Sequence, residues 1–187
     1  MPAVNGFVLA GGKSTRMGRD KALLEWHGRT LLEHMVALIS GATDRVQVIG
    51  RHPLPDQAPG HGPLSGIATA LKISETDANL VAAVDLPLLT EDFLKHLRSR
   101  LELSNSRLVV GKIGSQFPLC LGIRRALLPE LVARLESGDW SVRRFIQDCG
   151  AEVILEAELL ERGFNTSMFR NINSEEDYRT ARCRPLR

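Results

Sequence analysis

The chain has 187 residues, of which 43% are hydrophobic and 25% charged, which is the composition of a globular protein rather than a disordered one. Its 24 basic and 22 acidic side chains leave a formal charge of +2, which does not indicate a nucleic-acid-binding protein. No apolar run approaches the ~20 residues of a membrane span, and we expect no signal peptide, because the first residues lead directly into a strand. The three widely spaced cysteines, Cys120, Cys149 and Cys183, favour neither a disulfide framework nor a zinc site, so we expect a cytoplasmic protein.

Strand and helix patterns alternate along the first half of the chain. Short apolar runs bounded by glycines or turns predict strands at 4–10, 45–50 and 79–84. Helical spacing of apolar residues predicts helices at 30–40, 64–73 and 90–103. Thr30 and Glu33 have the spacing of a capping box, so we expect the first of these helices to begin just after Thr30.

The same alternation continues in the second half. It predicts strands at 108–112, 117–123 and 152–155, and helices at 127–136, 142–148 and 174–183. Ser174 is the expected N-cap of the last helix, with Asp177 three residues on. Neither a linker nor an internal repeat is found, so we expect one three-layer α/β/α domain over 1–187, with a mostly parallel, Rossmann-like sheet.

The segment that follows the first strand is rich in glycine and positive charge. It contains Gly11, Gly12 and Gly18, together with the cations Lys13, Arg16, Arg19 and Lys21, opposed only by Asp20. Glycine backbone and converging cations after a strand favour a polyanion such as a triphosphate; an exposed turn with scattered cations is the equally weighted alternative. Neither the P-loop pattern nor the GxGxxG fingerprint fits this segment.

Asp85 follows the predicted strand 79–84 directly and precedes Pro87 by two residues. Open α/β sheets bind ligands at the carboxyl ends of their strands, and Mg²⁺ commonly uses one or two carboxylates together with substrate phosphates. We therefore interpret Asp85 as a magnesium ligand. The alternative is that its carboxylate only accepts hydrogen bonds from the backbone of this turn.

A second glycine-containing loop, 61–66, enters the predicted helix 64–73, and Asp56 lies shortly before it. Gly62 and Gly66 could let the backbone approach a base or ribose, or they could only permit tight packing of helix on sheet. His27 and His34 are expected to face solvent, and nothing indicates a nucleophilic triad.

The run LAGGKSTRMGRDKALLEWHG, residues 9–28, resembles the signature of MobA-type molybdenum cofactor guanylyltransferases. These belong to a group of nucleotidyltransferases with a fold like that of sugar-nucleotide pyrophosphorylases. The resemblance continues through 61–66, 84–87 and 171–176, in the expected order, and so covers nearly the whole chain. The glycine pair and Asp20-Lys21 favour the guanylyl over the cytidylyl branch.

The resemblance implies a role for many of these residues. The nucleotide-binding residues would be Leu9, Ala10, Gly11, Gly12, Lys21, Asp56, Gly62, Pro63 and Asp85, with Asp85 also holding Mg²⁺. Asn171 and Asn173 would lie near molybdopterin, and Arg143 or Arg144 would supply a charge that relatives place directly after the acidic residue, where this chain has Trp140. The chain also departs from its relatives at Gly50, where some carry Asn, and at Phe117. Residues 1–105 would bind the nucleotide, and 106–187 the acceptor.

The implied reaction transfers GMP from GTP to the terminal phosphate of molybdopterin and releases pyrophosphate. That phosphate is mostly deprotonated at neutral pH, so catalysis would rest on Lys21, Arg16 and Asp85 with Mg²⁺, rather than on a general base. Transient contacts with molybdenum-insertion proteins and molybdoenzyme chaperones are implied as well. The alternatives are a molybdopterin cytidylyltransferase, a nucleotidylyltransferase for a sugar or other acid phosphate, and a non-catalytic GTP-binding module.

Overall fold

The structure is a computed structural model, and it describes residues 2–11, 20–51, 53–54 and 62–183. The main sheet in this part of the chain has six strands in the order β4-β1-β5-β7-β6-β8. These strands are β1 (Val4–Leu9), β4 (Arg45–Ile49), β5 (Ala78–Ala83), β6 (Leu108–Lys112), β7 (Cys120–Arg124) and β8 (Glu152–Leu155). β7 pairs antiparallel with β5 and β6, whereas the other neighbouring strands are parallel. The expected mostly parallel sheet is confirmed.

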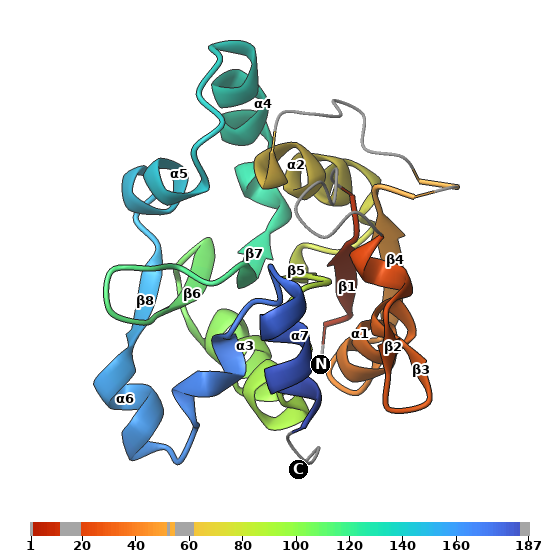
Figure 1. Ribbon diagram of the computed structural model, residues 1–187. Helices are drawn as coiled ribbons and strands as arrows, with labels where there is room; N and C mark the ends of the chain where they lie inside the picture. The colour runs from red at the N-terminus through yellow and green to blue at the C-terminus, as the bar shows by residue number, and fades with distance from the viewer. Residues whose placement is uncertain (1, 12–19, 52, 55–61, 184–187) are drawn as a thin grey trace.

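Helices cover both faces of this sheet (Figure 1). They are α1 (Leu31–Ser40), α2 (Pro63–Ile73), α3 (Glu91–Leu103), α4 (Leu128–Glu136), α5 (Val142–Asp148), α6 (Glu156–Glu161) and α7 (Glu175–Arg182). The apolar side chains of α1, α3, α6 and α7 belong to one core cluster, and those of α2, α4 and α5 to a second. The three-layer α/β/α fold is therefore confirmed. In the described part of the chain, no helix is both long and apolar enough to span a bilayer.

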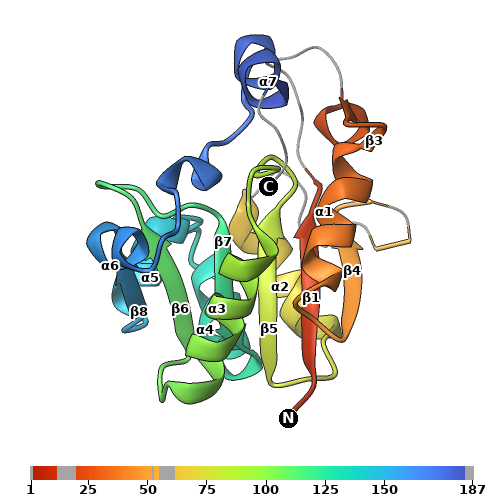
Figure 2. The same cartoon turned by 90° about the horizontal axis from the view of Figure 1, so that it is seen from below.

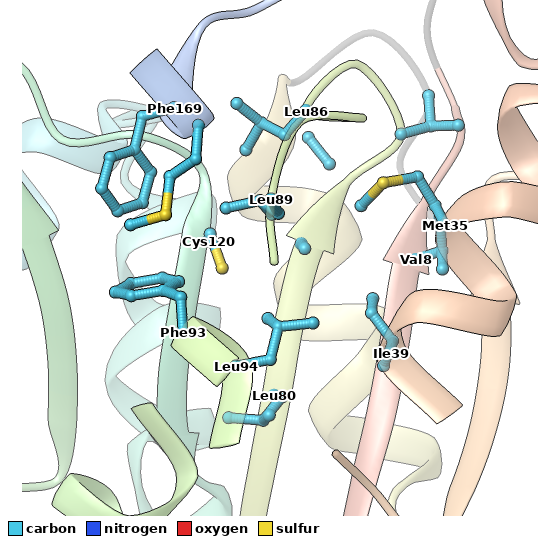
Figure 3. Close-up of a cluster of buried hydrophobic side chains, with 14 of the residues drawn as sticks. Val8, Met35, Ile39, Leu80, Leu86, Leu89, Phe93, Leu94, Cys120 and Phe169 are labelled. Carbon is cyan, nitrogen blue, oxygen red and sulfur yellow. The ribbon is translucent and has the colours of Figure 1, made fainter. Parts of the chain in front are cut away.

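The two cores arise from the alternation of side chains along each strand. In β5, Leu80 and Ala82 point into the first cluster, and Val81 points into the second. Figure 3 shows the first cluster, in which the rings of Phe93 and Phe169 meet edge to face, with centroids 4.8 Å apart and planes at 88°. Aromatic pairs prefer this geometry, which stabilises the packing of α3 under the sheet.

Several element boundaries follow the sequence pattern closely. The predictions for β6, α5 and β8 match residue for residue. Both predicted N-caps are present, and Thr30 and Ser174 each form a complete capping box. The predicted strand 117–123 is wrong at its start, because β7 begins only at Cys120. Pro118 has no N–H to donate to a strand ladder, which explains the later start.

Short elements escaped prediction. A hairpin of β2 (Glu25–Trp26) and β3 (Arg29–Thr30) precedes α1. The further elements are α6 and the 3₁₀ helices η1 (Lys21–Leu23), η2 (Arg125–Leu127) and η3 (Thr166–Phe169). Two-residue strands and single helical turns are too short to show the periodicity on which sequence prediction depends.

α7 lies beyond the carboxyl ends of β1 and β5, across from β3 (Figure 2). It rests on the hairpin: the Tyr178 hydroxyl donates to the backbone carbonyl of Glu25, and Arg182 forms an ion pair with the carboxylate of Glu25. The Tyr178 ring also lies 6.5 Å from that of Trp26, between centroids. The C-terminal helix is thereby fixed to a segment near the start of the chain.

Candidate active site

The candidate site lies where three parallel strands end together. Leu9 is in register with Ile49 of β4 and with Ala83 of β5. The backbone bonding continues one step further: the Ala10 N–H donates to the Ile49 carbonyl at 2.9 Å, and the Val84 N–H donates to the Leu9 carbonyl at 3.0 Å. Asp85 therefore begins the first turn beyond the sheet, beside the segment that follows β1.

Gly11 and Gly50 bring the two segments after β1 and β4 into direct contact. Gly50 has φ +90°, and a Cβ built on it would lie 2.4 Å from the Gly11 Cα. A Cβ on Gly11 would in turn lie 3.1 Å from the Gly50 Cα. Both glycines are needed for this approach, since any side chain at position 50 would displace the backbone next to Gly11. The glycine at position 50 thus has a local structural reason.

Lys21, Asp85 and Asn173 come together from three distant parts of the chain. The Lys21 Nζ donates to Asn173 Oδ1 at 2.8 Å and lies 3.6 Å from Asp85 Oδ2. The exposed fractions of the Lys21 and Asp85 side chains are 17% and 21%. The Ile172 N–H, next to Asn173, donates to the Asp85 carbonyl at 2.9 Å. The C-terminal segment therefore holds both the turn and the lysine.

Burial raises the pKa of the Asp85 carboxyl above its usual range, against the attraction of Lys21 and a hydrogen bond with its own backbone. Keeping the Asp85 carboxylate charged in this largely buried position therefore costs free energy. Such a group is typical of a functional site rather than of a stabilising ion pair. The alternative, in which the Asp85 carboxylate only accepts hydrogen bonds from the backbone of its turn, does not account for the nearby Lys21 ammonium.

A second ion pair fixes the approach to Lys21. Both carboxylate oxygens of Asp20 accept from the Arg51 guanidinium, and one also accepts from the Ala22 N–H at 3.1 Å as the N-cap of η1. The Arg51 hydrogen bond holds the pKa of Asp20 below its usual range, although burial acts in the opposite direction. Arg51 was not predicted, and no local pattern points to it, because it lies 31 residues from Asp20.

The donor set near Asp85 fits a magnesium ion that also binds substrate phosphates. Among the described residues, no three His, Cys, Asp or Glu side chains gather as a ready-made metal cage. Mg²⁺ does not need one, since one or two carboxylates, waters and phosphate oxygens commonly complete its shell. Asp85, whose side chain is 21% exposed, is a carboxylate that could serve as such a ligand.

The other predicted site residues differ in what the structure shows of them. Gly12, Arg16 and Asp56 lie outside the described residues. Gly62 is the N-cap of α2 and Pro63 its first residue; Gly62 has φ +75°, and a Cβ there would meet no described residue within 4 Å. Packing therefore does not explain Gly62.

Gly66 is explained by packing, because its Cβ would lie 3.3 Å from Leu9 Cδ2. In the acceptor half, Arg143, Arg144 and Asn171 are all exposed, and Arg144 Nη2 lies 3.2 Å from Asp139 Oδ1. Of the predicted acceptor residues, Asn173 is thus the one that the structure places beside Asp85.

The prediction for His34 is wrong. Its exposed fraction is 4%, and both ring nitrogens are in hydrogen-bond contact: Nε2 with the Pro87 carbonyl and Nδ1 with the Arg29 guanidinium, each at 2.8 Å. His34 lies one turn beyond Leu31 and beside Met35, at the edge of the buried stripe of α1. The sequence signal was present, because residues three apart share a helix face.

The sequence profile of the MobA-like NTP transferase domain matches residues 6–153. This range includes most of β1, as well as Lys21 and Asp85. The chain belongs to the MobA-like NTP transferase family. The recognised resemblance is confirmed, as is the expectation that the protein is a nucleotidyltransferase.

Relatives of this MobA-like transferase match nearly its whole length. A molybdenum cofactor guanylyltransferase of Xanthomonas euvesicatoria pv. vesicatoria (strain 85-10) is 34% identical over 183 residues, covering 92% of this chain and 91% of that protein. One from Syntrophotalea carbinolica is 29% identical over 182 residues, covering 91% and 87%.

A solved structure of similar shape is that of molybdopterin-guanine dinucleotide biosynthesis protein A from Archaeoglobus fulgidus. Its TM-score is 0.75 at 20% identity, covering 95% of this chain and 96% of that one. At this identity the likeness concerns the fold alone.

Proposed function

We propose that this MobA-like transferase moves GMP from GTP to the terminal phosphate of molybdopterin, forming a guanine dinucleotide and pyrophosphate. The observation that carries the proposal is the desolvated Asp85 carboxylate beside Lys21, at the shared carboxyl edge of β1 and β5. Relatives named molybdenum cofactor guanylyltransferase, matched over nearly their whole length, favour this acceptor and this nucleotide.

The reaction joins an oxygen of the acceptor phosphate to the α-phosphorus of GTP and breaks the bond to the β-phosphate. The acceptor phosphate has a second pKa near ~6, so it is already a nucleophile at neutral pH. The protein must hold two anions in line and offset the charge that develops on the phosphates. Lys21 and Arg16 would do this for the phosphates, with Lys21 fixed in place by Asn173.

Asp85 would hold the Mg²⁺ ion, which when bound neutralises phosphate charge and polarises the phosphorus–oxygen bonds. Asp85 forms an ion pair with Lys21, whose Nζ lies 3.6 Å from Asp85 Oδ2. The two side chains would therefore act on neighbouring phosphate oxygens.

Backbone contacts to GTP would come from the end of β1. The Ala10 N–H is already bonded to Ile49, and the Leu9 carbonyl to Val84. The contacts to the nucleotide would come from the Ala10 carbonyl and from the backbone of Gly11 and Gly12. Asp56, Gly62 and Pro63 would line the nucleoside, where Gly62 leaves open space at the start of α2.

The acceptor would approach from the half formed by residues 106–187, with 1–105 holding GTP. Asn171 is exposed and free of the Lys21 contact that occupies Asn173, so it is the better candidate for touching molybdopterin. Arg143 is exposed on α5 and would supply positive charge for the acceptor. Transient contacts with molybdenum-insertion proteins and with chaperones of molybdoenzymes would deliver substrate and remove product.

Pyrophosphate release tests this function. Purified protein with Mg²⁺, GTP and molybdopterin should release pyrophosphate, and omitting molybdopterin should stop the release. A preference for CTP over GTP would show the cytidylyl alternative, and activity with a sugar phosphate but not with molybdopterin would show another acceptor. GTP binding without pyrophosphate release under all these conditions would show a non-catalytic binding module.

A further inference from the structure

His34 connects α1 to the turn that carries Asp85. The ring is buried, with Nε2 2.8 Å from the Pro87 carbonyl and Nδ1 2.8 Å from a terminal nitrogen of Arg29. A guanidinium can only donate, so Nδ1 must accept from Arg29. The single ring proton then lies on Nε2 and is donated to Pro87. The two neighbours therefore select one neutral tautomer of His34.

Within the part of the chain that the structure describes, the turn has few other backbone hydrogen bonds to the rest of the protein. Before Asp85, Val84 is bonded to Leu9, and the Asp85 carbonyl accepts from Ile172. After Asp85, the Leu89 N–H bonds back to Leu86 within the turn, and Pro87 has no N–H to offer. The hydrogen bond from His34 thus connects the part of the turn after Asp85 to α1.

We propose that His34 is a positioning residue for nucleotidyl transfer, setting the place of the Asp85 carboxylate through its hydrogen bond to the Pro87 carbonyl. This inference rests on the proposed function for its effect on catalysis, but not for its effect on the turn. The hydrogen-bond contacts that the described residues give His34 are with Arg29 and Pro87, not with Lys21 or Asp85. Misplacement of a reacting group by about 1 Å is enough to cost a large part of the rate.

The charges around His34 support a neutral, donating ring. The charged or titratable groups that face it are Arg29 from β3 and His27 from the β2–β3 turn, and the ring of Trp26 lies 5.9 Å away, between centroids. A second ring proton, on Nδ1, would point at the Arg29 guanidinium. The ring proton therefore stays on Nε2, where it is donated to the Pro87 carbonyl.

Two substitutions distinguish a positioning role of His34 from a purely structural role. His34→Gln keeps an N–H at a similar reach from the backbone and can still donate to Pro87, whereas His34→Leu removes the donor but fills the space. Met35→Ala is the matched control, because Met35 is fully buried in the next position of α1 and its loss weakens packing without touching the bond. All four proteins are compared as full chains well below their melting temperatures.

We expect His34→Leu to lose about tenfold in kcat and to need more Mg²⁺ for half-maximal rate, with the KM for molybdopterin unchanged. His34→Gln should return to within about threefold of the parent, and Met35→Ala should keep the parent's kcat. Equal kcat for His34→Leu and the parent would overturn the proposal, as would an equal loss in Met35→Ala.

Amide hydrogen exchange tests the same inference without reference to the reaction. The amides of Leu86, Leu88 and Leu89 should exchange faster in His34→Leu than in the parent or in His34→Gln. Unchanged protection of these amides in His34→Leu would contradict the proposal even if the protein proved inactive with GTP. Absence of pyrophosphate release by the parent would instead contradict the proposed function alone.

Discussion

Gly50 and Gly11 are in backbone contact, and a Cβ on Gly50 would lie 2.5 Å from the Gly11 nitrogen. The contact joins the segments that follow β4 and β1, beside the predicted path of the nucleotide phosphates. Any side chain at position 50 would bring its Cβ against the Gly11 backbone in this structure.

Gly50→Ala should therefore raise the KM for GTP by roughly tenfold or more, because the added carbon displaces the Gly11 backbone. Steady-state kinetics and GTP titration would measure the change. Gly163→Ala is the matched control: Gly163 has φ +80°, but its Cβ would meet nothing within 4 Å. If Gly163→Ala lost the same amount of GTP affinity, the effect of Gly50→Ala would come from strain at positive φ and not from the contact with Gly11.

Asp85→Asn should separate activity from stability. Because burial raises the pKa of Asp85, the charged carboxylate costs folding free energy at neutral pH, and an amide of the same shape removes that cost. We expect a loss of roughly 100-fold or more in kcat with a Tm equal to or above the parent's. Near-normal turnover of the purified variant with Mg²⁺ present would refute the metal-binding role.

Lys21→Ala should lower kcat by roughly 100-fold or more, the scale expected for removing one charge-stabilising group. The side chain is 17% exposed and lies outside the apolar core, so circular dichroism should show an unchanged fold. Lys95→Ala is the control, because Lys95 is exposed on α3 and pairs only with Glu91 among the contacts described. Comparable losses in both variants would remove Lys21 from the mechanism.

Asn173 and Asn171 should respond differently to substitution by alanine. Asn173→Ala removes the acceptor of the hydrogen bond that Lys21 Nζ donates to Asn173 Oδ1, so we expect a lower kcat, by about tenfold, with little change in the KM for molybdopterin. Asn171→Ala should mainly raise the KM for molybdopterin, because this residue is exposed and makes no contact with Lys21. The opposite pattern would assign acceptor contact to Asn173.

Stability should fall in mild acid through His34. Burial lowers the pKa of His34 below its ordinary value of 6.5; Arg29 and His27 act in the same direction, and the bond to Pro87 opposes them. The unfolded chain therefore takes up a proton before the folded one does, and the unfolding free energy decreases as the pH falls below about 6.5. Urea unfolding from pH 7.5 to 5 should show a smaller decrease in His34→Gln than in the parent; equal slopes would contradict this origin.

The sequence predicted those parts of the fold and site that local patterns encode. The capping box at Thr30 and the strand that delivers Asp85 are both local, because hydrogen bonds over three residues and apolar runs suffice to define them. The Lys21–Asn173 contact joins residues 152 positions apart, and no periodicity reports it. The prediction that His34 faces solvent was wrong although its spacing from Leu31 already placed it beside the buried face of α1; its partners Pro87 and Arg29 are tertiary contacts that no spacing reports.

The packing of α7 on Glu25 and Trp26 makes the position of the lysine depend on a distant segment of the chain. Lys21 and Glu25 lie before α1, whereas Asn173 and Tyr178 lie just before and within α7. Because the same two segments meet at both contacts, a displacement of α7 from the hairpin would also draw Asn173 away from the Lys21 ammonium. Damage to the Tyr178 contact is therefore expected to reach the lysine without any change to the residues around it.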